Sequence, residues 1–373
     1  QLQSTVPSIG QKQLEFQEES KFFDVYKVEI GFPCYRLTNG RTRAEQLEII
    51  ANQGLEAEYF TADPDSEAAL EYQEKILLNM VTTGTEQQIT NILRHGQQTD
   101  ALILDSNGYV INGNRRLCVM RYLLEEDEIA YERYKHVQVL FLPPCGQNDI
   151  DELEARLQWQ PEGRSDYSWV AKAITLRQRQ EVNWSMERMS RFYKLTQAEI
   201  QLQIAILGHA EGYLEKLGLQ QVYSKVLNKQ FAFEQLHKSR KKCLNDEPKK
   251  QFFTNLAYVM MDDAESTGGR LYDSIPDALK SLSEINSRLQ EEFSDGLPGD
   301  RDEVGDGLEL LGSDTDSDYE HTASILREPN FGEDVRKIAR DTIQEMQQNE
   351  RERRDATYCL RELQKASTAL LNA

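Results

Sequence analysis

Residues 25–145 alternate between two hydrophobic periods, one typical of strands and one typical of helices. Apolar and polar residues alternate from Val25 to Ile30, which predicts a half-buried strand. Apolar residues recur at helical spacing over 66–81, directly after Ser66, a residue type that suits a helix N-cap. Further strands are expected at 101–104, 109–111 and 136–142, a hairpin turn at 105–108, and helices at 85–96 and from 114 onward. This order predicts a small mixed α/β domain over 25–145, preceded by an N-terminal extension at 1–24 that shows no period.

After Pro144 the strand pattern stops, and consecutive helices are expected over a helical domain at 146–290. The segment 291–330 is expected to be an acidic linker, because residues 291–320 hold 12 acidic residues and one basic residue. Residues 331–373 predict a C-terminal helix that serves self-association, as in a homodimer, or docking to a protein partner. The expected fold class is therefore α+β, with a small α/β domain, an all-helical domain and a C-terminal helix.

Composition restricts the location and the partners of the chain. Its 43 Lys and Arg residues stand against 63 Asp and Glu residues, a net charge of −20, so contact with DNA requires a local basic patch. Five scattered cysteines without a CxxC pair argue against a disulfide framework and fit the cytoplasm. No membrane span, signal peptide or metal site is expected, since long apolar runs, a signal pattern and metal-ligand spacings are all missing from the sequence.

The most informative motif is the run Gly113-Asn114-Arg115-Arg116 between a predicted strand and a predicted helix. Glycine lets the backbone turn sharply and approach a ligand. The start of a helix offers unpaired N–H groups and a positive dipole to an anion, and adjacent arginines add forked donors. The motif predicts a phosphate site. The alternative is that one arginine pairs with an acidic neighbour and the other is solvated.

The wider context resembles the N-terminal domain of the ParB/sulfiredoxin superfamily over about residues 25–145. The shared order is a helix that ends in Gly96, an apolar strand, an Asn-Gly hairpin, and the glycine–arginine run that enters a helix. The loop from Pro33 to Arg41 takes the place of a family segment that contains arginine.

This resemblance implies binding or hydrolysis of a nucleotide, CTP or ATP, with Mg²⁺. Gly113, Arg115 and Arg116 would hold the phosphates, and Asn114 would hydrogen-bond a phosphate or order a water. The resemblance also implies that Arg36 and Arg41 close over the phosphates and that Gly96 shapes the adjoining loop.

The sequence departs from the family at three points. Asn114 stands where the family has glutamate, and an amide cannot act as a carboxylate base. The sulfiredoxin branch has a catalytic cysteine at that position, so sulfiredoxin chemistry is not expected, and Cys118 is interpreted as a small buried residue. Residues 154–160 lack the "Glu-Asn-x-Gln-Arg" helix of partition proteins, which weakens the expectation of CTP hydrolysis like theirs.

Residues 184–207 are predicted to form a helix-turn-helix-like element, placed where ParB proteins carry their DNA-reading module. Its candidate base-reading residues are Gln197, Gln201 and Gln203. Its candidate phosphate anchors are Arg188, Arg191 and Lys194. The alternative is a helical packing domain that has lost DNA reading.

A second basic cluster contains Lys238, Arg240, Lys241 and Lys242, and it is either a phosphate-binding patch or a solvated helix face.

Three functions remain open at this stage. The first is a nucleotide-responsive, DNA-associated protein of plasmid or phage partition. The second is a ParB-like nuclease or NTPase of phage defence, for which Asp105 and Glu74 could supply carboxylates, although nothing pairs them and no catalytic residue can be assigned. The third is an interaction module that keeps the fold without a nucleotide.

Overall fold

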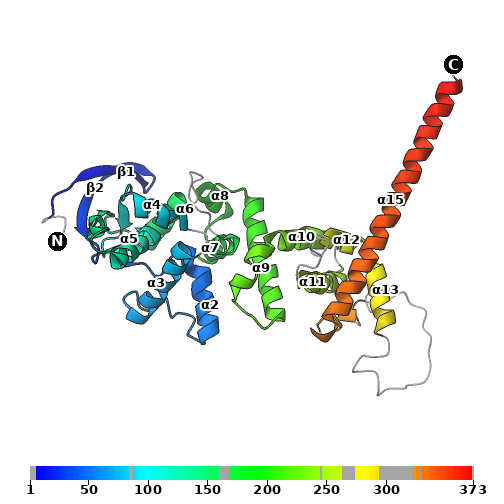
Figure 1. Ribbon diagram of the computed structural model, residues 1–373, viewed down its shortest axis with the longest axis horizontal. Helices are drawn as coiled ribbons and strands as arrows, with labels where there is room; N and C mark the ends of the chain where they lie inside the picture. The colour runs from blue at the N-terminus through cyan, green and yellow to red at the C-terminus, as the bar shows by residue number, and fades with distance from the viewer. Residues whose placement is uncertain are drawn as a thin grey trace. The chain divides into compact units, whose positions relative to one another are not determined.

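The computed structural model describes residues 6–83, 87–158, 168–243, 246–262, 274–293 and 329–371, with a few positions between 319 and 327. The chain divides into two compact units, residues 1–227 and 228–373 (Figure 1). The first unit combines a six-stranded sheet with helices, and the described elements of the second unit are helical. This confirms the expected α+β fold class.

A mixed sheet with the strand order β1-β2-β6-β4-β5-β3 forms the centre of the first unit. Its two parallel pairs are β4 with β6 and β3 with β5. The expected hairpin joins β4 to β5, and the Asp105 carboxylate accepts hydrogen bonds from the backbone N–H groups of Asn107 and Tyr109 in its turn. The strands are β1 (Gly10–Phe16), β2 (Glu19–Glu29), β3 (Cys34–Tyr35), β4 (Leu102–Leu104), β5 (Tyr109–Asn112) and β6 (His136–Phe141).

Most of the expected N-terminal extension at 1–24 belongs to the sheet instead. β1 pairs antiparallel with β2, from Gly10 opposite Val25 to Phe16 opposite Glu19. The two residues between these strands, Gln17 and Glu18, have positive φ angles of 54° and 62°. Such a hairpin turn is usually built by asparagine or glycine, so this sequence carries no signal for it.

Helices α3, α4 and α5 contact one another and share one core with the sheet. The Ser66 hydroxyl accepts a hydrogen bond from the N–H of Ala69, which confirms this residue as the N-cap of α3. The expected start of α4 at Thr85 lies outside the described residues. The core includes Leu77, Leu102, Leu117, Val119 and Val139, all fully buried. These helices are α2 (Arg43–Gln53), α3 (Glu67–Thr82), α4 (Gln87–His95) and α5 (Asn114–Glu126), with short 3₁₀ turns at Gly40–Thr42 and Glu132–Tyr134.

The domain boundary expected at residue 145/146 falls inside the first unit. Four further helices belong to this unit: α6 (Gln147–Gln158), α7 (Trp169–Glu181), α8 (Met186–Tyr193) and α9 (Gln197–Lys216). Ile150 and Leu153 of α6 pack in the same cluster as Leu14 and Leu140 of the sheet, which joins the helical part to the α/β part. α9 runs as one helix through Gly208.

The second unit contains α10 (Gln230–Arg240), α11 (Glu247–Met261), α12 (Ile275–Lys280), α13 (Leu282–Glu292) and α15 (Gly332–Leu371). The last of these matches the expected C-terminal helix. The expected acidic linker at 291–330 lies mostly outside the described residues. Within the part of the chain that the structure describes, no helix has the length and apolar character needed to cross a membrane.

Candidate functional site

The glycine–arginine motif forms the turn between β5 and α5. Gly113 is the N-cap of α5, with φ of 113° and ψ of 12°, a backbone conformation that favours glycine. A Cβ atom at this position would lie 2.5 Å from Cδ2 of the fully buried Leu102 and 3.1 Å from Nη2 of Arg116. The sharp turn therefore requires glycine for its conformation and for its space.

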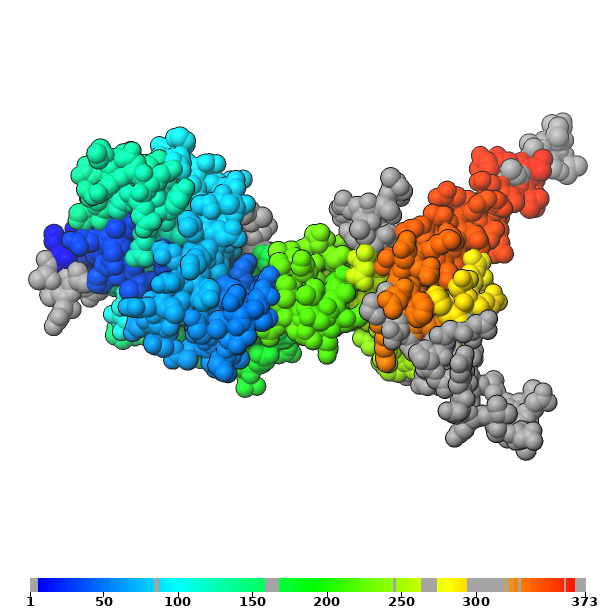
Figure 2. Space-filling model, turned by 60° about the horizontal axis from the view of Figure 1, so that its bottom comes forward, coloured from blue at the N-terminus to red at the C-terminus, as the bar shows by residue number. Residues whose placement is uncertain are grey.

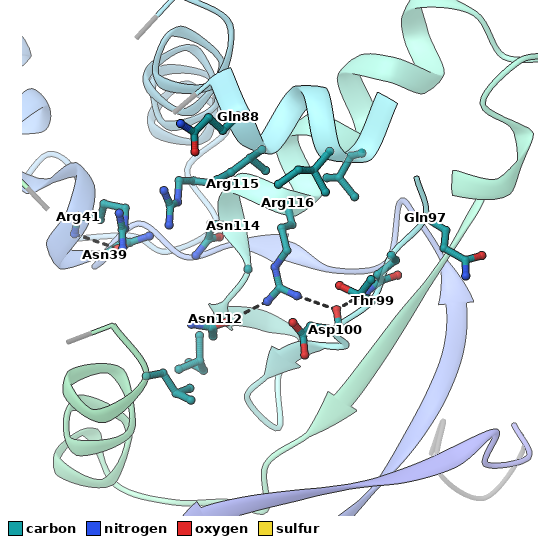
Figure 3. Close-up of a pocket in the computed structure, with 17 residues that line it drawn as sticks. Asn39, Arg41, Gln88, Gln97, Thr99, Asp100, Asn112, Asn114, Arg115 and Arg116 are labelled. Carbon is teal, nitrogen blue, oxygen red and sulfur yellow. Dashed lines mark hydrogen bonds between the residues drawn. The ribbon is translucent and has the colours of Figure 1, made fainter. Parts of the chain in front are cut away.

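The N-terminus of α5 faces a cleft lined by residues 112–116 (Figure 3). The N-cap residue Gly113 has no side chain with which to cap this helix start. The first intrahelical bond runs from the N–H of Leu117 to the carbonyl oxygen of Gly113, so the preceding N–H groups lie ahead of the hydrogen-bond ladder. Such a helix start attracts an anion through its N–H groups and its dipole.

The side chain of Asn114 is buried and bonds to the backbone on both sides of the cleft floor. Its Oδ1 accepts from the N–H of Arg36 at 3.3 Å, and its Nδ2 donates to the carbonyl oxygen of Val110 at 2.8 Å. These two hydrogen bonds give Asn114 a positioning role, and its contact with a phosphate stays a prediction. Asn114 fixes the start of α5 against β5 and the loop after β3.

The two arginines of the motif differ in their partners. Arg116 donates from Nη1 to the carbonyl oxygen of Asp100 at 2.7 Å and from Nη2 to Oδ1 of Asn112 at 3.0 Å (Figure 3). It therefore ties the cleft floor to the segment before β4. Figure 3 places Arg115 on the other side of Asn114, toward Arg41. Arg41 lies in the 3₁₀ turn at Gly40–Thr42, whose N-cap Asn39 accepts from the N–H of Arg41. Arg41, Arg115 and Arg116 thus line one cleft, while the guanidinium groups of Arg115 and Arg116 point away from each other (Figure 3).

The cleft has a volume of about 240 Å³ and combines a cationic side with an apolar side. Among the described residues, its charged lining consists of three arginines and Asp100, whose carboxylate lies 2.8 Å from Nζ of Lys12. Sequence reasoning missed the other walls, since α4, α6 and the segment before β4 come together only in the fold. These further lining residues include Gln88, Ile89, Ile92, Leu93, Gln97, Gln98, Thr99 and Leu157.

Arg36 does not line the cleft, contrary to the expectation that it closes over the phosphates. Its side chain is buried, with Nη1 3.3 Å from Glu154 and Nη2 3.9 Å from Asp151 of α6. Asp151 also lies 2.6 Å from Nη1 of Arg179 in α7. The carboxylates of Asp151 and Glu154 need cationic partners because they are buried. Arg36 pairs with them and is therefore not part of the cleft lining.

Gly96 lies just after α4 and shapes the adjoining loop by close approach. A Cβ atom there would lie 2.8 Å from the carbonyl oxygen of Ile92. The carbonyl oxygens of Leu93 and Gly96 also accept hydrogen bonds from the hydroxyl of Tyr134. Gly96 therefore sets the path of the chain into the cleft wall without lining the cleft itself.

The helix-turn-helix-like element is formed by α8, a turn with Lys194 at φ of 52°, and α9. α9 begins with a full capping box between Thr196 and Glu199. Met189, Phe192 and Ile200 are buried in its core.

The candidate DNA contacts of this element differ in availability. Arg188 bonds to Glu152 and its guanidinium carbon lies 3.8 Å from the ring centroid of Trp184, so it stabilises the fold. Nη2 of Arg191 lies 3.6 Å from Oε1 of Glu18. Gln197 donates to Glu187 at 3.2 Å, and Gln203 is half-buried. Lys194, Gln197 and Gln201 are exposed.

In the second unit, the basic cluster lies at the end of α10 and in the 3₁₀ turn Lys241–Cys243. Nζ of Lys238 lies 3.5 Å from Oε2 of Glu234, and Nη2 of Arg240 lies 3.2 Å from Oε1 of Glu247. Lys241 and Lys242 are exposed side by side in the chain. Lys238 of the same cluster is exposed as well.

The carboxylates considered for catalysis have structural partners away from the cleft. Asp105 accepts from the hairpin backbone, and Glu74 accepts from the hydroxyl of Tyr35 at 3.2 Å. Cys118 is buried as expected, and burial raises the pKa of its thiol to about 12. Within the described ranges, no group of three His, Cys, Asp or Glu residues is placed to hold a metal ion.

The chain matches no family model, no curated protein and no solved structure. The resemblance to ParB-like proteins therefore rests on the order of the motifs, and the chemistry of the site rests on its geometry.

Proposed function

We propose that this is a ParB-like, DNA-associated protein whose cleft binds the phosphate groups of a nucleotide. The observation that carries the proposal is the convergence of the α5 N-terminus with Arg41, Arg115 and Arg116 on one cleft. Helix N–H groups and guanidinium groups are donors well suited to phosphate oxygens. These three arginines give the cleft a local positive charge, although the whole chain has a net charge of −20.

The apolar side of the cleft favours a nucleotide over free phosphate. Ile92 of α4 lines the cleft and is 65% exposed, and Ile89 and Leu157 extend this surface. Small-molecule sites are mostly apolar and contain a few placed polar groups, which a base and a sugar would match. The amides of Gln88 and Gln97 add polar groups at the rim.

A protein-held Mg²⁺ does not fit the described lining. Divalent cations prefer several oxygen ligands, and the lining carboxylate, Asp100, already lies 2.8 Å from Lys12. The proposal therefore rests on N–H and guanidinium donors, and CTP and ATP are its candidate ligands without a distinction between them.

Isothermal titration calorimetry with CTP, ATP, GTP and inorganic phosphate tests this proposal. Arg115→Gln should weaken nucleotide binding by about tenfold or more, because a hydrogen bond to a charged group contributes ~1.5–3 kcal/mol. Arg94→Gln is the matched control, since Arg94 lies on α4, pairs with Glu126 at 2.7 Å and is not a lining residue. No heat with any nucleotide, or equal affinities of wild type and Arg115→Gln, would refute the proposal. Binding of inorganic phosphate as tight as that of the nucleotides would refute the role of the apolar side.

DNA contact is proposed for two exposed polar surfaces. On the first unit, Lys194 lies in the turn before α9, and Gln197 and Gln201 lie in the first turns of α9, where a recognition helix presents its side chains. On the second unit, Lys241 and Lys242 form an exposed cationic pair. Lysine would supply phosphate contacts and glutamine would supply contacts to adenine edges.

Fluorescence anisotropy of labelled duplex DNA at several salt concentrations tests the DNA proposal. Lys241→Gln/Lys242→Gln should reduce the slope of log K against log salt by about 1.8, since each phosphate contact contributes about 0.9. Lys75→Gln, an exposed lysine of α3, should leave the slope unchanged. Absence of binding at low salt would remove the DNA-associated role while leaving the nucleotide site intact. The proposed setting is plasmid or phage partition in the cytoplasm, where thiols such as that of Cys34 stay reduced.

A further inference from the structure

An aromatic groove lies on the first unit and is separate from the cleft at the start of α5. It has a volume of about 670 Å³, and it shares no lining residue with that cleft. Its walls come from β2 and the loop after it, from the turn between β4 and β5, and from the end of β6 with the two prolines that follow. Figure 2 shows atoms of the N-terminal strands, in dark blue, at the surface of the first unit.

Three aromatic rings pack together in this groove. The ring centroid of Phe141 lies 6.0 Å from that of Tyr26 and 6.0 Å from that of Phe32. Tyr26 is buried, whereas Phe32 and Phe141 are half-buried and keep part of their surface open to the groove. Phe22 also lines the groove and is 66% exposed. Exposed apolar surface that is gathered in one place, rather than scattered, marks a site that binds another molecule.

The charges of the groove favour a polypeptide over a nucleic acid. Proteins that stack single-stranded nucleic acid on aromatic rings combine the rings with positively charged side chains. Of the described residues that line the groove, Asp24 is the only charged one. Its carboxylate accepts hydrogen bonds from Nε2 of Gln11 at 3.0 Å and from Oγ of Ser8 at 3.5 Å. Both donors are neutral, so the negative charge of Asp24 is complementary to a basic group on the ligand.

The polar groups of the groove favour a proline-rich segment among polypeptides. Such a segment forms a polyproline II helix, which has no internal hydrogen bonds and whose carbonyl oxygens therefore need outside donors. The hydroxyl of Ser106 and the amide of Asn107 line the groove and are exposed in the turn between β4 and β5. Aromatic grooves of this kind bind proline-rich segments, because the segment is already extended and loses little conformational freedom.

We propose that this groove docks a proline-rich segment of another protein, and that a basic residue of the segment pairs with Asp24. The proline rings pack on Phe22, Phe32 and Phe141, and the turn between β4 and β5 donates hydrogen bonds to the carbonyl oxygens. This interaction does not depend on the nucleotide or on DNA, since neither the cleft nor the DNA-contact surfaces contribute to the groove.

Fluorescence anisotropy of the labelled peptide Arg-Ala-Pro-Pro-Leu-Pro-Pro-Leu-Pro, titrated with the full chain, tests the proposal. We expect saturable binding that Phe22→Ala weakens by about tenfold, because an aromatic anchor of an interface costs this much or more when it is truncated. Phe22 is mostly exposed, so its replacement should leave the fold intact, which circular dichroism checks. Ile129→Ala is the matched control, since Ile129 is 90% exposed and does not line the groove, and it should bind like the wild type.

Two altered peptides separate the roles of charge and proline. Replacement of the arginine by glutamate should weaken binding to the wild type, and Asp24→Asn should remove this difference while it keeps an acceptor for Gln11. Replacement of every proline by glycine should abolish binding. The proposal is overturned if the wild type does not bind the first peptide, if the glycine peptide binds equally well, or if Phe22→Ala or Asp24→Asn behaves like the wild type.

Other occupants of the groove give different results. Binding of labelled oligothymidylate that Phe22→Ala removes would assign the groove to nucleic acid. A dimer in sedimentation equilibrium that Phe22→Ala dissociates would assign it to a second copy of the chain. Either result would overturn the proposal.

Discussion

Replacement of Gly113 by alanine probes the turn on which the cleft depends. At φ of 113° an alanine adopts a strained conformation that costs about 1–2 kcal/mol. Its Cβ would also lie 2.5 Å from Cδ2 of Leu102, which is fully buried and cannot move without its neighbours. Overpacking of this kind costs about 1–3 kcal/mol. We therefore expect Gly113→Ala to lower the free energy of unfolding of the first unit by about 2–5 kcal/mol.

Urea unfolding followed by tryptophan fluorescence measures this change. Trp159, Trp169 and Trp184 are the tryptophans of the chain, and all belong to the first unit. Gly218→Ala is the matched control, because Gly218 has a positive φ of 66° but a Cβ atom there would have no neighbouring atom within 4 Å. The control should show the conformational cost without the clash, so it should destabilise by about 1–2 kcal/mol. Equal destabilisation by the two substitutions would refute the argument that Leu102 closes off the turn.

Three further predictions follow from the charges and thiols of the first unit. Arg36→Met should lower the free energy of unfolding of the unit, measured in urea, by about 3–5 kcal/mol, because it leaves the buried carboxylates of α6 short of a cation. The double variant Arg36→Met/Glu154→Met should recover part of this loss. A loss below about 1 kcal/mol for Arg36→Met would contradict the buried network. Glu199 has its pKa lowered by hydrogen bonds from Thr196, so its contribution to stability is present above pH 4.5 and is lost as the pH falls through the lowered pKa. The difference in melting temperature between wild type and Glu199→Gln should accordingly shrink on acidification, and a difference independent of pH would count against the capping box. Iodoacetamide at mildly alkaline pH should alkylate the exposed Cys34 well before Cys118, whose pKa burial raises to about 12; peptide mass mapping checks the order, and equal rates would contradict the burial of Cys118.

Local signals in the sequence predicted the elements whose geometry depends on residues a few positions apart. Ser66 and Thr196 accept from the N–H three residues later, and the Asp105 turn closes within four residues. The sharp turn at Gly113 follows from the steric freedom of one residue type. Each of these interactions is complete within a single turn, so the order of residues along the chain is enough to recognise it.

The partners of charged and amide side chains could not be read in this way. Arg36 resembles a cleft residue in sequence, yet it meets Glu154, a carboxylate more than a hundred positions away that the fold buries beside it. Asn114 resembles a ligand-binding residue in sequence, yet its amide accepts a hydrogen bond from the N–H of Arg36 and donates one to the carbonyl oxygen of Val110. A long-range pair depends on which elements pack together, and neither partner shows this in its own neighbourhood.

The amino-acid sequence by itself determined the α+β class, the sharp glycine turn at 113–116 and the C-terminal helix, because periodicity and backbone conformation are properties of short stretches. Tertiary structure alone decided that β1 extends the sheet, that α6 belongs with the α/β part, and that Arg41 joins Arg115 while Arg36 turns away. The physical reason is burial: a side chain that leaves water must find its partner wherever the packed elements provide one.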